Sequence, residues 1–99
     1  MEKLVERFIR YARLNSRSDD QSKTCPSTPG QMVLARMLFD ELTELGLSDI
    51  SLDENGYLMA TLPSNTDKPV PVIGFLAHMD TSSDFKADNV NPQIIEHTG

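Results

Sequence analysis

The chain opens on a segment whose apolar residues recur at spacings of one, three and four positions. This period places them on one side of a helix, with charged residues on the opposite side. We predict a helix from Glu2 to about Leu14, with an apolar stripe formed by Leu4, Val5, Phe8, Ile9 and Ala12. The polar residues from Asn15 to Thr24 show no period, which predicts an irregular connection after this helix.

A second helix is predicted from Thr28 to Leu45. Thr28 suits the N-cap, Pro29 suits the first helical position, and Gln31 completes a Thr-x-x-Gln capping box. Its predicted apolar stripe comprises Leu34, Met37, Leu38, Leu42 and Leu45. Gly46 stands where a left-handed residue ends a helix, and Leu47 is placed to complete a Schellman motif.

Two short strands come after the second helix. The sequence predicts them at Asp49–Asp53 and Tyr57–Leu62, because Asn55-Gly56 between them is a strong hairpin signal. Pro63 closes the second strand, and a polar surface loop leads to the next apolar segment.

The run from Val72 to Ala77 contains no polar residue and includes two β-branched residues and an aromatic residue. Such a run is typical of a strand that is covered on both faces. The elements together predict an α/β fold, in which two helices, a hairpin and this buried central strand form a mixed sheet flanked by helices. His78 and Asp80 come directly after the strand, at the edge where open α/β sheets place their ligands.

His78 and Asp80 are the strongest candidates for chemistry. Side chains two apart on an extended segment point the same way, so the carboxylate can lie beside the imidazole ring. There it would fix the tautomer and make the other ring nitrogen a better metal ligand. The same pair could instead serve as an oriented general base, or it could be a strand-end histidine satisfied by a nearby carboxylate. His97 is a weaker candidate ligand, because histidines near a terminus are usually solvated.

The composition narrows the function classes. A formal net charge of −6 at pH 7 argues against a nucleic-acid surface, which needs clustered basic residues. Arg7, Arg10, Arg13 and Arg17 recur at helical spacing, but acidic residues among them favour a solvated helix face over an anion site. The single cysteine, Cys25, fits a reducing compartment. No leader and no membrane-spanning run is evident, so we expect a cytoplasmic protein without a membrane partner.

The segment from Gly74 to Ser82, Gly-Phe-Leu-Ala-His-Met-Asp-Thr-Ser, resembles the first metal-site motif of the co-catalytic zinc exopeptidases. Within that family the aminotripeptidases are most similar. Three further stretches resemble them in the same order along the chain: Pro26–Gln31, Gly56–Pro63 and Asn89–Ile95. The resemblance therefore covers most of the chain and is more specific than the His-x-Asp pair alone.

This resemblance implies a cytoplasmic enzyme that uses two zinc ions to release the N-terminal residue from tripeptides. His78 would bind one zinc, and Asp80 would be the catalytically important carboxylate behind it. Residues 1–99 would form the N-terminal part of the catalytic domain. The bridging carboxylate, the catalytic glutamate, the other ligands and a dimerisation domain would lie beyond Gly99, and the full-length protein could be a homodimer.

A second interpretation from a different class stays open. The chain could be a non-catalytic acidic α/β module, or a truncated product, in which His78 and Asp80 are structural. The two interpretations differ in the sequence they require beyond Gly99, because the enzyme needs further Asp, Glu and His residues there.

Overall fold

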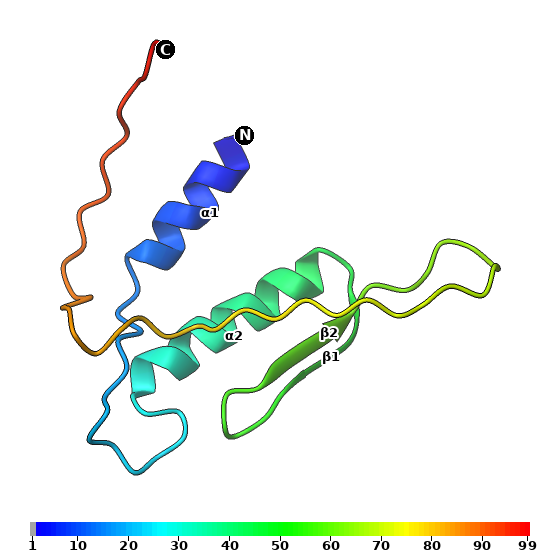
Figure 1. Ribbon diagram of the computed structural model, residues 1–99, viewed down its shortest axis with the longest axis horizontal. Helices are drawn as coiled ribbons and strands as arrows, with labels where there is room; N and C mark the ends of the chain where they lie inside the picture. Colours follow the sequence, from blue (N-terminus) through cyan, green and yellow to red (C-terminus); the bar gives the residue numbers. More distant parts are fainter. Residues whose placement is uncertain (1) are drawn as a thin grey trace.

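The computed structural model describes residues 2–99 and contains two helices followed by a hairpin (Figure 1). Helix α1 spans Glu2–Ala12 and helix α2 spans Pro29–Glu44. Strand β1 (Ser48–Leu52) pairs with strand β2 (Leu58–Thr61) in an antiparallel sheet. The predicted helices and hairpin are thus confirmed, and they form a small α/β arrangement.

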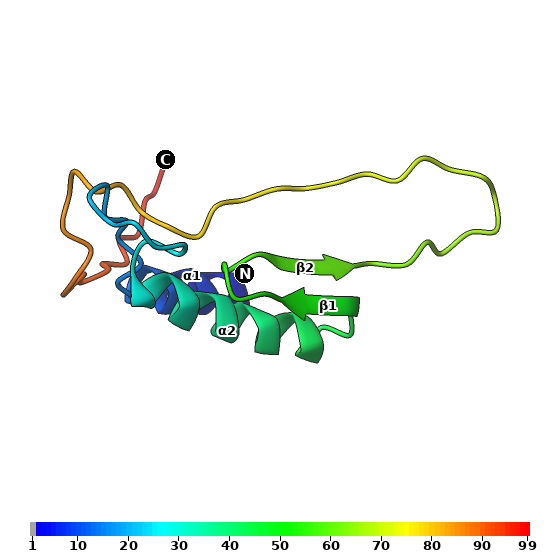
Figure 2. The ribbon, with the colours of Figure 1, turned by 90° about the horizontal axis from the view of Figure 1, so that it is seen from below.

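The hairpin lies along α2, mainly through β1 (Figure 2). Leu34 and Ala35 on α2 are buried at 7% and 0% exposure, and Ala87 is the third buried apolar residue among those described. So small a core stabilises the chain only weakly, because hydrophobic stabilisation grows with the apolar area removed from water.

The start of α2 departs from the predicted capping box. Thr28 is the N-cap, with extended backbone, and Pro29 occupies the first turn, as predicted. However, the Thr28 hydroxyl donates to the Arg17 carbonyl at 2.8 Å and does not cap the helix. Gln31 bonds instead to Ser27, accepting from its backbone N–H at 3.2 Å and donating to its hydroxyl at 2.9 Å. The Thr28 side chain therefore ties α2 to the preceding loop, which the local sequence pattern could not reveal.

The end of α2 is the predicted Schellman motif. The Gly46 N–H donates to the Thr43 carbonyl at 3.0 Å, and the Leu47 N–H donates to the Leu42 carbonyl at 3.2 Å. Gly46 has a φ of +81°, a conformation that costs glycine little because it has no Cβ. This termination aims the chain directly into β1.

The turn between the strands is organised by Asp53. The Gly56 N–H donates to the Asp53 carbonyl at 3.1 Å, while the Asp53 carboxylate accepts from the N–H groups of Asn55 and Tyr57 at 2.9 Å. Gly56 has a φ of +84°, as a type I turn followed by a left-handed residue requires. The predicted hairpin is confirmed, with β1 beginning and ending one residue earlier than expected and β2 shorter than expected.

Helix α1 forms as predicted, but its apolar stripe is not a core face. Leu4 is 60% exposed and Phe8 is 68% exposed. The helix is linked to α2 through Glu41, which pairs with Arg7, with Arg10 and with the hydroxyl of Tyr11. Arg7 and Arg10 are therefore ion-pair partners, not merely part of a solvated face. Neither helix within residues 2–99 combines the length and hydrophobicity of a membrane span.

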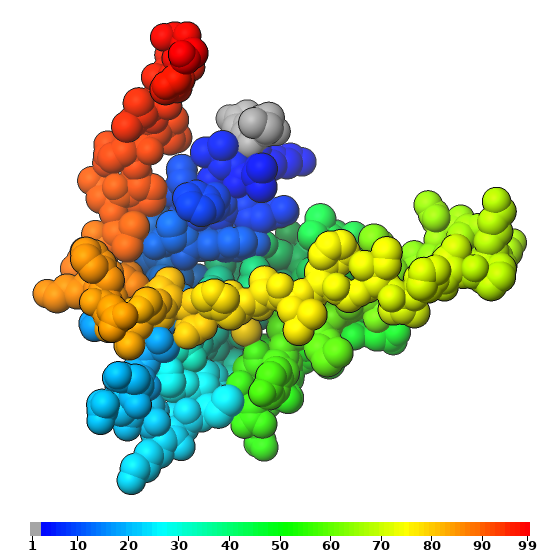
Figure 3. Space-filling view, in the orientation of Figure 1, coloured from blue at the N-terminus to red at the C-terminus, as the bar shows by residue number. Residues whose placement is uncertain are grey.

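The predicted central strand is the main point on which the structure differs. Residues 70–80 cross the molecule as one extended chain, in yellow in Figures 1 and 3, without pairing with any strand of the described residues. Val72, Phe75 and Leu76 are 95–99% exposed. A strand needs backbone partners and a covering layer, and residues 2–99 supply neither at this place. The predictions of a buried strand and of a mixed sheet are wrong for this chain.

We expect the 99-residue chain to be marginally folded. Its radius of gyration is 16.4 Å, whereas a compact domain of this size has about 13 Å. Exposed apolar side chains along residues 70–77 should bind a hydrophobic dye or drive self-association, and the thermal transition should be broad. Phe75→Ser should reduce the dye fluorescence. A sharp two-state melt of a soluble monomer would contradict this expectation.

Candidate functional site

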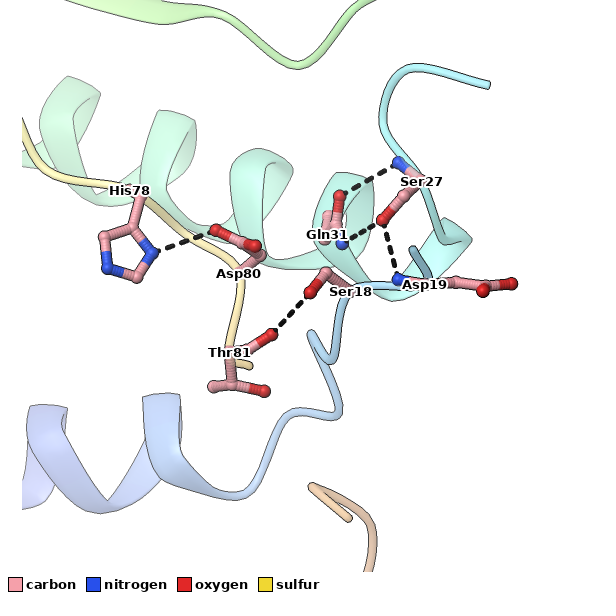
Figure 4. A network of polar contacts seen from close by, with 7 residues as sticks. All are labelled: Ser18, Asp19, Ser27, Gln31, His78, Asp80 and Thr81. Atoms are coloured by element: carbon pink, nitrogen blue, oxygen red, sulfur yellow. Dashed lines mark hydrogen bonds and ion pairs between the residues drawn. The ribbon is translucent and has the colours of Figure 1, made fainter. Parts of the chain in front are cut away.

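The predicted contact between His78 and Asp80 is present. The ring Nδ1 of His78 lies 2.9 Å from Asp80 Oδ1, and both residues belong to the extended chain that passes α2 (Figure 4). A carboxylate accepts hydrogen bonds, so this contact favours the tautomer in which Nδ1 carries the proton and donates it. In the neutral imidazole of that tautomer, the other ring nitrogen, Nε2, has a free lone pair.

The two side chains differ in their access to solvent. The His78 side chain is 83% exposed, and the Asp80 side chain is 42% exposed. An exposed hydrogen bond of this kind adds little to stability, because water competes for both groups. The pair therefore acts mainly through geometry, by holding the imidazole in one tautomer and one orientation.

Zinc is the metal that the resemblance implies, and the donor chemistry of the pair fits it in part. Imidazole nitrogen is a preferred zinc ligand, and a carboxylate on the opposite ring nitrogen is its usual companion. Within residues 2–99, however, no three His, Cys, Asp or Glu side chains gather closely enough to hold a metal. Nδ1 of His97 accepts a hydrogen bond from the Gly99 N–H at 3.1 Å and does not join the pair. The described residues thus supply one oriented ligand.

A loop segment that the sequence did not single out holds the chain just after Asp80. Thr81 forms a parallel bridge with Arg17. The Thr81 N–H donates to the Ser16 carbonyl at 3.1 Å, and the Thr81 carbonyl accepts from both the N–H and the hydroxyl of Ser18 at 2.9 Å (Figure 4). Ser16 is 3% exposed, whereas Thr81 is exposed, so only the Ser16 side of this junction is buried.

Arg17 adds a side-chain contact to the same junction. Its guanidinium donates to the Ser83 carbonyl through Nε at 3.0 Å and also through a terminal nitrogen. The helical spacing of the arginines suggested a solvated face, but Arg17 lies beyond α1 in the loop. No local pattern marks a residue whose partner lies 66 positions away.

A hollow of about 450 Å³ adjoins this junction. Its lining is polar and comes from the loop, the start of α2 and the segment after Thr81, namely Asn15, Arg17, Ser18, Asp19, Asp20, Thr28, Pro29, Gly30 and Ser83. Neither His78 nor Asp80 lines it. The hollow is therefore separate from the candidate metal ligand.

Comparison with known proteins shows what the chain is similar to. No protein-family model matches the chain. It is 63% identical over 95 residues to Peptidase T of Geobacillus kaustophilus, 62% identical over 94 residues to that of Bacillus licheniformis, and 60% identical over 95 residues to that of Bacillus subtilis. These matches cover 95–96% of the chain but 23% of each relative. The predicted resemblance is confirmed: the chain is similar over nearly its whole length to these Peptidase T proteins, and it spans about a quarter of the length of the relatives it matches.

Proposed function

We propose that this chain supplies part of the catalytic domain of a cytoplasmic zinc aminopeptidase that releases the N-terminal residue from tripeptides. The observation that carries the proposal is the 2.9 Å contact between His78 Nδ1 and Asp80 Oδ1, at the end of a motif that resembles a zinc site. The names of the curated relatives support peptidase activity. Zinc and tripeptides enter through the motif resemblance.

His78 would hold one zinc ion through Nε2. When bound, the metal would supply an activated water as nucleophile and a positive charge to polarise the scissile carbonyl. The role of Asp80 is to accept a hydrogen bond from the Nδ1–H group. This bond keeps the Nε2 lone pair directed outward and raises the basicity of Nε2. Because the ring is exposed, a zinc ion held at Nε2 would be accessible to further ligands from another part of the protein.

The remaining parts of the site would come from other segments of a longer polypeptide. A catalytic zinc takes three protein ligands and a water, and a second zinc needs more. Residues 2–99 contain no second group that gathers with His78 and Asp80. The relatives are about four times longer than this chain, which leaves ample sequence for these groups and for a homodimer interface.

The proposal is tested by comparing the 99-residue chain with a full-length protein, meaning one that carries this chain and matches its relatives in length. The full-length protein should hydrolyse tripeptides after zinc loading and lose the activity to a chelator. The isolated chain should show no turnover above background, because a single ligand cannot assemble the site. An N-acetylated tripeptide is the matched control, since an aminopeptidase requires the free amine.

Two results would overturn the proposal. One is the absence of tripeptide hydrolysis by a folded, zinc-loaded full-length protein. The other is turnover by the rigorously purified 99-residue chain. The non-catalytic interpretation predicts the first of these results, with zinc binding no tighter than that of unrelated acidic proteins.

A further inference from the structure

We propose that the loop Ser16–Ser18, with Arg17 as its principal side chain, is a positioning clamp for the His78–Asp80 pair. This inference rests on the proposed function, since it assigns Arg17 a role in placing that site. Arg17 is a positioning residue and touches neither substrate nor metal. It acts by fixing the chain directly after Asp80.

The chain near the pair lacks other backbone attachments. Between the end of β2 and Thr81, residues 62–80 make no backbone hydrogen bond to the rest of the described chain. The next such bonds join Thr81 to Ser16 and Ser18. Asp80 immediately precedes this junction, and His78 lies two residues further back. Within residues 2–99, the backbone bonds nearest to the pair are therefore those of the clamp, and they set the direction of the chain that carries His78 and Asp80.

The clamp is itself held from two sides. The Arg17 guanidinium reaches the Ser83 carbonyl, and the Arg17 carbonyl accepts the hydroxyl of Thr28 at 2.8 Å. Thr28 is the N-cap of α2. The clamp therefore links the pair to helix α2, which carries two of the buried apolar residues of the core.

Catalysis requires precise placement of the groups that take part in it. A misplacement of about 1 Å at a catalytic group can cost on the order of 100-fold in rate. Arginine suits a clamp because its planar fork places two N–H donors on one carbonyl, whereas lysine offers a flexible point charge. Arginine at position 17 is therefore better suited to holding the chain in one orientation than to supplying a positive charge.

The test uses the full-length protein with Arg17→Ala and Arg17→Lys, and Arg13→Ala as the matched control. Arg13 is exposed and its side chain makes no hydrogen bond or ion pair within the described residues. Arg17→Ala should weaken zinc affinity by about 10-fold and lower kcat more than it raises KM. Arg17→Lys should recover part of the loss, and Arg13→Ala should change neither quantity. Side-chain nitrogen NMR of His78 should show that Arg17→Ala disturbs the Nδ1–H contact with Asp80.

The outcomes separate the clamp from the proposed function. If the unmodified full-length protein neither binds zinc nor cleaves tripeptides, the proposed function fails, and the His78 NMR signals still test the clamp. If the unmodified protein is active and Arg17→Ala lowers the melting temperature but leaves zinc affinity, kcat and the His78 signals unchanged, Arg17 is only a stabilising residue and the clamp is overturned.

Discussion

Replacing His78 with alanine in the full-length protein is expected to reduce tripeptide turnover by more than about 100-fold. The substitution deletes the ligand itself, whereas changing a partner behind a ligand costs about 10–100-fold. In the 99-residue chain the side chain is 83% exposed, so its loss leaves no cavity and the melting temperature of that chain should change little. Turnover and zinc content are measured on the full-length variant, and the melting temperature is measured on the same variant of the 99-residue chain.

His97→Ala is the matched control for this experiment. His97 is an exposed histidine whose ring, within the described residues, makes a single hydrogen bond, which it accepts from the Gly99 N–H. Its replacement should leave turnover and zinc content unchanged. Near-normal turnover in folded His78→Ala would contradict the assignment, and a loss of zinc in His97→Ala would revive the weaker candidate ligand.

The second large effect is expected for Gly30→Ala in the 99-residue chain. Helix propensity alone predicts that alanine stabilises a helix by about 0.5–1 kcal/mol relative to glycine. The structure reverses that sign, because a Cβ on Gly30 would lie 1.9 Å from the carbonyl oxygen of Asn15. That neighbour is backbone, so the loop must move as a whole. Overpacking of this kind costs about 1–3 kcal/mol, which exceeds the gain in propensity.

The effect is measured as the urea midpoint of the far-UV circular dichroism signal. Gly74→Ala is the matched control, since a Cβ at Gly74 meets nothing within 4 Å in this chain. The midpoint should fall for Gly30→Ala and stay close to the original value for Gly74→Ala. An unchanged or higher midpoint for Gly30→Ala would show that the loop and α2 do not pack closely at Asn15.

The sequence predicted those parts of the fold that local interactions determine. The helix end at Gly46 and the turn at Gly56 depend on bonds between residues at most five positions apart, and both formed as expected. The contact between His78 and Asp80 was predictable for the same reason, because alternation along an extended chain brings side chains two apart together.

The rest depends on partners distant in sequence. The run Val72–Ala77 has the composition of a buried strand, yet it is exposed because the described residues provide no neighbouring strand or layer. The apolar stripe of α1 is exposed for the same reason. Arg17 belongs to a helical series in the sequence, but its function in the fold is decided by Ser83 and Thr28. Single-sequence patterns carry no information about such pairings.

The most direct test of the central claim is the zinc affinity of Asp80→Asn in the full-length protein, measured by competition with a chromophoric chelator. Asp67→Asn is the matched control, since Asp67 is exposed and its carboxylate makes no hydrogen bond or ion pair within the described residues. If Asp80 orients a zinc-bound His78, Asp80→Asn should bind zinc about 10–100-fold more weakly, while the melting temperature of the metal-free protein changes little and Asp67→Asn binds normally. Unchanged zinc affinity in folded Asp80→Asn would contradict the account, because the pair would then be only a structural contact.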